Sequence, residues 1–333
     1  MNLFELTTEL VKIPSVSGDE QKVGAFLGDY LRELGYEVEL QEVLDGRKNV
    51  IAWASDNPRV FFSTHQDTVP PFIAPSSDDA NIYGRGACDA KGIIASQIVA
   101  AEKLRSEGVN DIGLLFTIDE EEGSKGARAA NQHKIAAKCQ YLINGEPTDN
   151  ELAIGSKGSL RVHLKAHGKA AHSAYPEEGE SAIEKLLDIL SDVREMKLPN
   201  DDFFGATTMN IGTISGGLKT NVIPPEAEAG LHFRLVGDEK TILQTLEKAV
   251  ANRADIDVAS IALPVKMLKV ENFKQKVVRF TTDIPHLSNW GTPLLLGAGS
   301  ILVAHTKNEF VAKKDLLEAV DLYCGLAKKL LAT

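Results

Sequence analysis

The sequence has few cysteines and no long apolar run, and both absences exclude classes of protein. Its 333 residues include three cysteines, Cys88, Cys139 and Cys324, and no CxxC pair. An odd number of widely spaced cysteines argues against a disulfide framework and is typical of a reducing compartment. No segment approaches the roughly 20 apolar residues that span a bilayer. The first residues mix acidic and apolar side chains, which indicates an amphipathic helix and no signal peptide, so we expect a cytoplasmic protein.

Basic residues are fewer than acidic ones. The chain has 36 Lys and Arg against 47 Asp and Glu, a formal net charge of −11. This balance argues against nucleic acid and against anionic membranes as partners. Hydrophobic residues make up 43% and charged residues 25%, which is typical of a globular protein with a large core. The length favours two domains.

Apolar periodicity predicts an α/β domain that is interrupted by a smaller one. Helical spacing over 3–11 and 21–34 is followed by apolar runs at 49–54, 60–65, 112–119 and 141–145 that alternate with further helical segments. This order predicts a mixed sheet with helices on its faces. Residues 157–267 instead show half-polar strands and helices in β-α-β-β-α order, which predicts an inserted α+β domain of the ferredoxin-like kind. We therefore expect a metal-binding domain formed by 1–156 and 268–333.

Acidic residues and histidines recur where predicted strands end in loops rich in glycine and proline. In open α/β sheets, sites gather at the carboxyl ends of strands. The five segments are THQDTVP (64–70), GRGACDAKG (84–92), TIDEEEGS (117–124), NGEPT (144–148) and GAGSILVAHTKNE (297–309).

These segments contain enough nitrogen and oxygen ligands for two zinc ions. The candidate ligands are His65, Asp89, Glu121, Glu146 and His305. Zinc binds imidazole and carboxylate, and five such ligands suffice for a pair if Asp89 bridges both ions. Each residue taken alone is more often structural, and acidic runs are usually solvated. The repetition of the pattern at successive strand ends is what favours a metal pair.

Two further carboxylates have predicted roles beside the ligands. Asp67 lies two residues after His65, so both side chains share a face of the strand and Asp67 can orient the imidazole. Glu120 adjoins Glu121 and has no ligand role, which makes it the candidate general base.

The segments resemble, in order, the motifs of the M20 family of metallopeptidases and deacylases. The matching motifs are HxDTVP, GRGxxDxKG, DEExGSxGA, GEPT, GKAAHSAxP and a terminal AHT..E. The family includes acetylornithine deacetylase, succinyl-diaminopimelate desuccinylase, acetyl-lysine deacetylase and carboxypeptidase G. The resemblance implies His65 and Glu146 on one zinc, Glu121 and His305 on the other, and Asp89 between them.

The resemblance also implies three substrate-facing residues in the inserted domain. His172, in HGKAAHSAYP, would reach the site of a partner subunit and steady the oxyanion, so we expect a homodimer through this domain. Asn221, in GGLKTNVIP, and Arg234, in HFRL, would hold the substrate carboxylate. The alternatives are that His172 caps a turn and Arg234 is a surface residue. The other histidines, which fall on no motif, are interpreted as structural or solvated: His133, His163, His167, His232 and His286.

The sequence and the resemblance together favour a two-zinc hydrolase that cleaves the amide bond of a small N-acyl amino acid. N-acetylornithine or N-acetyl-lysine is the first expectation, because the chain is short for the family, and the products would be a carboxylate and a free amino acid. The alternative is a metallo-dipeptidase or carboxypeptidase on the same zinc pair. A third interpretation is a noncatalytic zinc-dependent binding protein, which the intact Glu120 disfavours. Cobalt or manganese remains open as a substitute metal.

Overall fold

The computed structural model describes residues 1–332, which form two compact units. Among the described residues, the first consists of 1–154, 267–276 and 282–332, and the second of 155–266 and 277–281. The second unit is therefore inserted into the first in sequence. Residues 277–281, which we expected in the first domain, cluster with the second unit.

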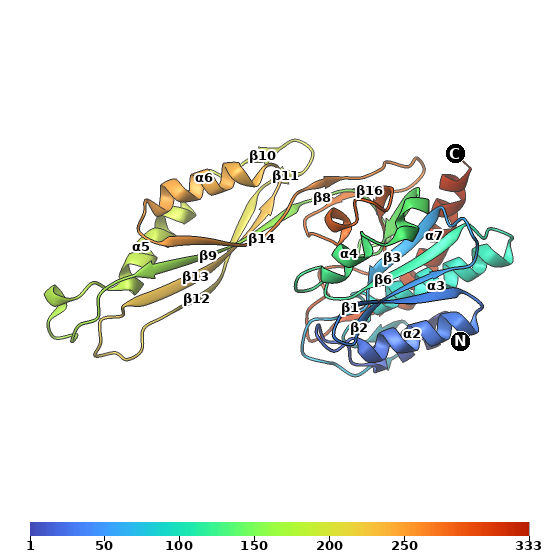
Figure 1. Ribbon diagram of the computed structural model, residues 1–333, viewed down its shortest axis with the longest axis horizontal. Helices are drawn as coiled ribbons and strands as arrows, with labels where there is room; N and C mark the ends of the chain where they lie inside the picture. The colour runs from blue at the N-terminus through green and yellow to red at the C-terminus, as the bar shows by residue number, and fades with distance from the viewer. Residues whose placement is uncertain (333) are drawn as a thin grey trace. The chain divides into compact units, whose positions relative to one another are not determined.

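The first unit is built on a mixed sheet (Figure 1). Its strand order is β1-β2-β6-β3-β7-β17-β8. Four strands in the middle, β6, β3, β7 and β17, run parallel, and the others pair antiparallel. The strands are β1 (Glu37–Leu44), β2 (Arg47–Trp53), β3 (Val60–His65), β6 (Ile112–Thr117), β7 (Tyr141–Asn144), β8 (Leu152–Ser156) and β17 (Thr292–Leu295).

Helices cover both faces of this sheet. Phe62 packs into the larger core under one set of helices, whereas its neighbour Phe61 points to the other face and meets Trp290 edge-on at 4.9 Å. Strands β3 and β6 are buried along their whole length for this reason. The larger core contains residues of four helices, α1 (Leu3–Lys12), α2 (Gln21–Glu33), α3 (Lys91–Ser106) and α7 (Lys313–Leu331). The core on the opposite face contains residues of α4 (Lys125–Ala130), of η1 (Lys134–Lys138) and of the loop after η3 (Ile284–His286).

The remaining elements of the two units are short strands and one 3-10 helix. One three-stranded sheet joins β18 (Phe310–Ala312), β5 (Asn81–Tyr83) and β4 (Ser76–Ser77). Pairing of Phe310 with Tyr83 brings the last sequence motif beside the loop that carries Asp89. The other short elements are β10 (Asn200–Asp201), β11 (Gly205–Ala206), β15 (Val265–Lys266), β16 (Gln275–Val278) and η2 (Pro176–Glu178).

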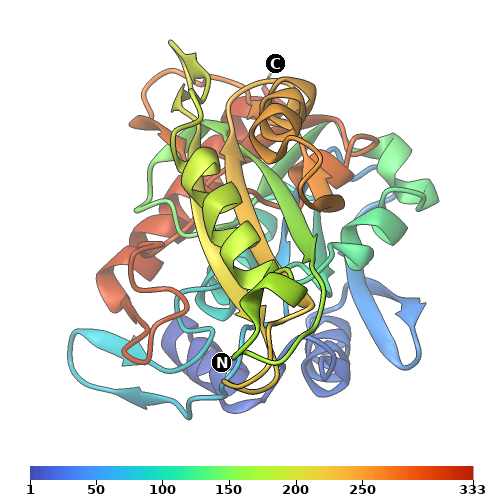
Figure 2. The ribbon, with the colours of Figure 1, turned by 90° about the vertical axis from the view of Figure 1, so that its left-hand side faces the viewer.

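The second unit is a four-stranded antiparallel sheet with two helices on one face (Figure 2). The order β12-β13-β9-β14 uses β9 (Gly158–His167), β12 (Thr208–Gly216), β13 (Glu226–Leu235) and β14 (Asp255–Ala262), with α5 (Ala182–Arg194) and α6 (Glu239–Val250). The sequence analysis does not predict strand β14, whose side chains are mostly exposed. The predicted fold class, an α/β unit with an inserted α+β unit, is confirmed. No helix within residues 1–332 is long and apolar enough to cross a membrane.

Candidate metal centre and active site

The predicted ligands of the first unit converge at one edge of its sheet. His65 ends β3, Glu121 follows β6, Glu146 follows β7, and His305 lies in the loop after β17. Because these four strands are parallel, their carboxyl ends meet at the same edge. Asp89 arrives there from the loop that precedes α3.

Asp89 lies between the two imidazoles. Its Oδ1 is 3.0 Å from Nε2 of His65, and its Oδ2 is 3.3 Å from Nε2 of His305. Nε2 of His65 is also 3.9 Å from Oε1 of Glu146, and Nε2 of His305 is 2.9 Å from Oε1 of Glu121. The potential ligand atoms of His65, Asp89 and Glu121 all lie within 4.8 Å of one another. Each histidine thus has its own glutamate, and the aspartate is shared.

Burial and charge make this cluster suited to divalent cations. The side chains of His65, Asp89 and Glu146 are almost fully buried, while that of His305 is 48% exposed. Burial raises the pKa of Glu146 and of Glu121, and neighbouring carboxylates add to both shifts. Hydrogen bonds to Asp89 and Glu121 raise the pKa of His305 to about 10. Cations bound in this cluster would take the place of protons on these groups. A set of imidazole nitrogens and carboxylate oxygens fits zinc or a related divalent metal.

We expected the Asp67 carboxylate to orient the His65 imidazole, but the backbone of Asp67 lies closer to that imidazole. The nearest acceptor for Nδ1 of His65 is the backbone carbonyl oxygen of Asp67 at 3.0 Å, and the Asp67 carboxylate is 3.6 Å away. That carboxylate accepts hydrogen bonds from the backbone N–H groups of Glu120 (3.1 Å) and Glu121 (3.2 Å) and from the Ser17 hydroxyl (2.7 Å). Asp67 therefore fixes the loop that carries the candidate base, as well as the imidazole.

Glu120 lies in an environment that favours its protonated form. Burial raises the pKa of Glu120 well above its usual value, and the charges of Asp283 and Glu121 raise it further, against the opposing effect of His65. A carboxylate that accepts and returns protons near neutral pH needs a raised pKa. The environment of Glu120 is therefore suited to proton transfer.

Asp283 is a buried carboxylate that the sequence analysis missed. It accepts a 2.7 Å hydrogen bond from the Thr117 hydroxyl, and burial raises its pKa to about 6. Among residues 1–332, its Oδ1 has no hydrogen-bond partner. No motif marks this aspartate, because its proximity to Glu120 arises from chain segments more than 150 residues apart.

Glu309 holds the loop of Asp89 and was also missed. Its Oε1 accepts hydrogen bonds from the backbone N–H groups of Gly86 (2.9 Å), Cys88 (3.2 Å) and Asp89 (3.1 Å), and Arg85 donates to its Oε2 at 2.6 Å. The signal was present in the terminal AHT..E motif, but nothing in the sequence says what the glutamate contacts. The structure indicates that it positions Asp89.

We expect Glu309→Gln to weaken metal binding by about 10- to 100-fold, because outer partners orient metal ligands. An amide cannot accept three N–H groups and a guanidinium as well as a carboxylate does. Titration calorimetry with zinc measures the affinity. Glu33→Gln, an exposed glutamate of α2, is the control and should leave the affinity unchanged. Equal affinities of Glu309→Gln and the control would contradict the positioning role.

The three predicted substrate-facing residues of the second unit do not lie together. The loops of His172 and Asn221 pair with each other through the His172–Val222 bridge and a 3.1 Å hydrogen bond from Ser173 N–H to Asn221 O. Arg234 pairs with Ser159 at the opposite end of β13. Arg234 is eight residues from Glu226, the first residue of β13, and this separation corresponds to roughly 25 Å along the strand. One small substrate therefore cannot touch Arg234 and Asn221 of the same chain.

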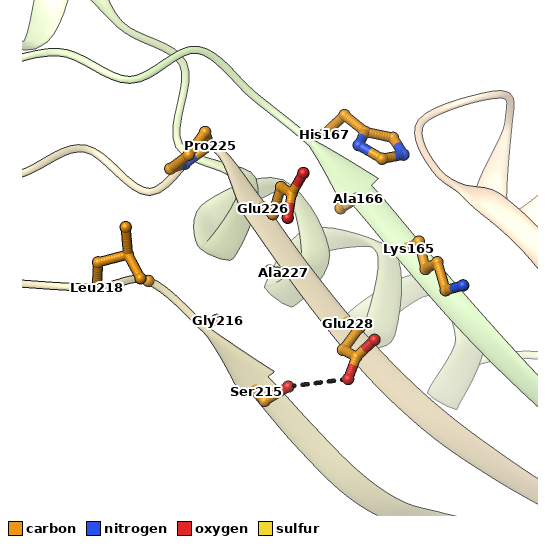
Figure 3. Close-up of a pocket in the computed structure, with 11 residues that line it drawn as sticks. Lys165, Ala166, His167, Ser215, Gly216, Leu218, Pro225, Glu226, Ala227 and Glu228 are labelled. Carbon is orange, nitrogen blue, oxygen red and sulfur yellow. Dashed lines mark hydrogen bonds between the residues drawn. The ribbon is translucent and has the colours of Figure 1, made fainter.

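A groove of about 640 Å³ lies on the second unit, between the ends of β9, β12 and β13 (Figure 3). Lys165, Glu228 and Leu218 are among its lining residues. None of the predicted site residues lines it. The groove therefore shares no residue with the carboxylate–imidazole cluster.

Two family models match the chain. The model described as "Peptidase dimerisation domain" of the M20 type matches residues 154–258, most of the second unit. The model described as "Peptidase family M28" matches residues 49–203. Together with the cluster at the sheet edge, these matches define a hydrolase of the metallopeptidase class.

Two relatives show which family the chain belongs to. A peptidase M20 domain-containing protein of Schizosaccharomyces pombe is 38% identical, over 97% of this chain and 83% of that protein. A probable carboxypeptidase of Aspergillus clavatus is 35% identical, over 99% of this chain and 89% of that protein. The chain belongs to the M20 peptidase family. The family resemblance is thus confirmed, but the deacetylase subgroup is not.

Solved structures share the fold. An M20 family metallo-carboxypeptidase of Sulfolobus solfataricus gives a TM-score of 0.79 at 18% identity, covering 97% of this chain and 98% of that one. A dinuclear metal-binding peptidase of the M20 family from Bacillus subtilis gives a TM-score of 0.72 at 16% identity, covering 99% and 98%. At these identities the likeness establishes the fold.

Proposed function

We propose that this protein is a metal-dependent carboxypeptidase or dipeptidase that hydrolyses the last peptide bond of a short peptide. The observation that carries the proposal is the placement of Asp89 between His65 and His305, each with its own glutamate. Relatives at 35–37% identity are named probable carboxypeptidases. This favours the peptidase alternative over the deacetylase that we first expected.

Two divalent cations fit the donor set, and zinc suits it by ligand type. His65 and Glu146 would hold one ion, His305 and Glu121 the other, with Asp89 shared. The Bacillus subtilis structure is of a dinuclear peptidase, which supports a pair. When bound, the cations would lower the pKa of water and polarise the scissile carbonyl.

Proton transfer is assigned to Glu120. It removes a proton from the attacking water and returns it to the leaving amine, so that the peptide bond breaks and a carboxylate and an amine form. Asp67 holds the Glu120 loop through two backbone N–H groups. His172 donates to the carbonyl oxygen as negative charge develops there. Arg234 binds the C-terminal carboxylate with paired hydrogen bonds.

The separation of Arg234 from His172 and Asn221 supports a site that uses two copies of the chain. Because one small peptide cannot reach both ends of the same β13, one chain would contribute Arg234 and its partner His172 and Asn221. The match of residues 154–258 to a dimerisation domain supports the same arrangement. We therefore propose a homodimer formed through the second unit.

A substrate panel tests the function. Metal-saturated protein is incubated with dipeptides and tripeptides, with the same peptides amidated at the C-terminus, and with N-acetylornithine and N-acetyl-lysine, and amine release is measured. We expect cleavage of the free peptides and at least about 10-fold slower cleavage of the amidated ones, because a guanidinium loses its charged partner. Hydrolysis of the N-acetyl amino acids alone would restore the deacetylase interpretation. No hydrolysis of any compound would favour a noncatalytic binding protein.

A further inference from the structure

The loop that carries Glu120 and Glu121 has an unfavourable backbone conformation. Asp119 and Ser124, which flank the two glutamates, both have left-handed backbone, with φ of 66° and 53°. Residues other than glycine keep this conformation only where their surroundings hold them in it. The carbonyl oxygen of Asp119 accepts hydrogen bonds from the N–H groups of Gly123 (3.0 Å) and Ser124 (2.6 Å), which closes the loop into a turn. These internal bonds do not fix the turn to the sheet, so contacts outside it decide where the two glutamates lie.

The side chain of Asn49, in β2, joins the two ends of this loop. Its Oδ1 accepts a 3.1 Å hydrogen bond from the N–H of Ile118, and its Nδ2 donates to the carbonyl oxygen of Gly126 at 2.8 Å. Nδ2 also donates to Oε1 of Gln41 at 2.9 Å, so both hydrogens of the amide have a partner. Asn49 is fully buried. A buried amide whose groups are all satisfied holds its partners in one arrangement.

Asn49 lies where the backbone pairing between β2 and β6 ends. The last pair of this antiparallel ladder is Val50 with Phe116, and beyond it the Asn49 side chain, not the β2 backbone, binds the N–H of Ile118. Gly126 packs closely against the same point. A Cβ at position 126 would lie 2.4 Å from the carbonyl oxygen of Ile118 and 2.6 Å from Oδ1 of Asn49. The two ends of the loop and the amide therefore form one tightly packed junction.

We propose that Asn49 is a positioning residue for Glu120 and Glu121, the candidate base and a candidate metal ligand. The proposal rests on the proposed metal-dependent peptidase function and concerns the same site. The Asp67 carboxylate holds the middle of the loop through the N–H groups of the two glutamates, and Asn49 holds both ends. The loop is thus fixed at three points. This keeps Glu121 at its 2.9 Å distance from His305 and Glu120 at a constant distance from both.

Asn49→Asp separates the two halves of this role. The carboxylate can still accept the N–H of Ile118, but it cannot donate to the carbonyl oxygen of Gly126, which it repels. We expect zinc affinity, measured by calorimetry of the metal-depleted protein, to fall about 10- to 100-fold. In zinc-saturated protein, kcat for a cleaved dipeptide should fall about 10²-fold, the effect of misplacing a reacting group by about 1 Å, with KM unchanged. Asn49→Ser, which is neutral and too short to reach both partners, should act in the same direction.

Hydrogen exchange of the metal-free protein gives a readout that does not depend on hydrolysis. We expect a peptide covering residues 117–126 to exchange at least about 10-fold faster in Asn49→Asp and Asn49→Ser than in the wild type, because an unpinned loop opens more often. Peptides from α7 should exchange at the wild-type rate. This comparison measures the mobility of the loop directly, before any metal or substrate is added.

Two control variants separate positioning from general stability. Lys48→Gln changes the neighbouring residue of β2, whose side chain pairs with the exposed Glu42 at 3.2 Å, and should behave like the wild type. Leu326→Ala removes a buried side chain of α7 from the core on the sheet face opposite to α4. It should lower the unfolding temperature without changing zinc affinity, kcat or exchange of residues 117–126.

The outcomes distinguish the positioning role from the proposed function. If the Asn49 variants only lower the unfolding temperature, as Leu326→Ala does, and leave zinc affinity, kcat and loop exchange unchanged, Asn49 is a structural residue and the proposal is wrong. If these variants loosen the loop and weaken zinc binding but the wild type cleaves no peptide, the proposed function fails and the positioning role stands.

Discussion

Replacing Glu120 with glutamine is expected to lower kcat by about 10²- to 10⁴-fold, the range for loss of a general acid–base group. Glutamine keeps the shape of the side chain but can neither take a proton from water nor return one to the leaving amine. Backbone hydrogen bonds from residues 120 and 121 to Asp67 do not involve the Glu120 side chain, so the loop should remain in place. Steady-state kinetics on a cleaved peptide measure the effect.

The control for this prediction is Glu122→Gln, an exposed glutamate in the same loop. It should retain wild-type kcat. Metal content, measured by mass spectrometry of the purified proteins, should be equal in both variants and the wild type. A Glu120→Gln variant that binds metal and keeps near-full activity would show that another group transfers the proton.

Replacing Asp89 with alanine is expected to abolish activity through loss of metal. Asp89 places one oxygen near each histidine, so its removal affects both halves of the cluster at once. Loss of an outer partner of a metal ligand costs about 10- to 100-fold in affinity, and loss of a shared ligand should cost more than about 100-fold. Zinc titration and metal analysis after dialysis measure the change, with activity as a second readout.

Asp79→Asn is the control, because Asp79 is exposed in the β4–β5 turn. It should bind metal and hydrolyse peptide like the wild type. Excess zinc should not restore the Asp89→Ala variant to wild-type activity. If this variant retained two tightly bound ions, the aspartate would not be the shared ligand.

Local sequence patterns were sufficient for the main elements of the fold. The continuous apolar run of β3 reflects burial on both faces, with Phe62 in one core and Phe61 in the other. Amphipathic spacing predicted α1 and α2, because each of these helices buries only one face. Strand β14 escaped prediction because it is an edge strand that buries little, so its position depends on pairing with β9 and not on its own composition.

Long-range contacts account for the site residues that were missed. Glu309 accepts a hydrogen bond from the N–H of Asp89, 220 positions away in the chain. Asp283 accepts one from Thr117, 166 positions away. Residue type alone does not indicate such partners, because a carboxylate in a loop is usually solvated. Only the path of the chain shows that both are buried beside the cluster.

The sequence by itself determined the chemistry that is available: imidazoles and carboxylates at the ends of strands, an acid beside a ligand, and the motifs of the M20 family. The tertiary structure decided how these groups are shared. It placed Asp89 between His65 and His305, and it separated Arg234 from Asn221 by the length of β13. The physical reason is that side-chain type and periodicity are local properties, whereas distances between segments follow from strand order and register.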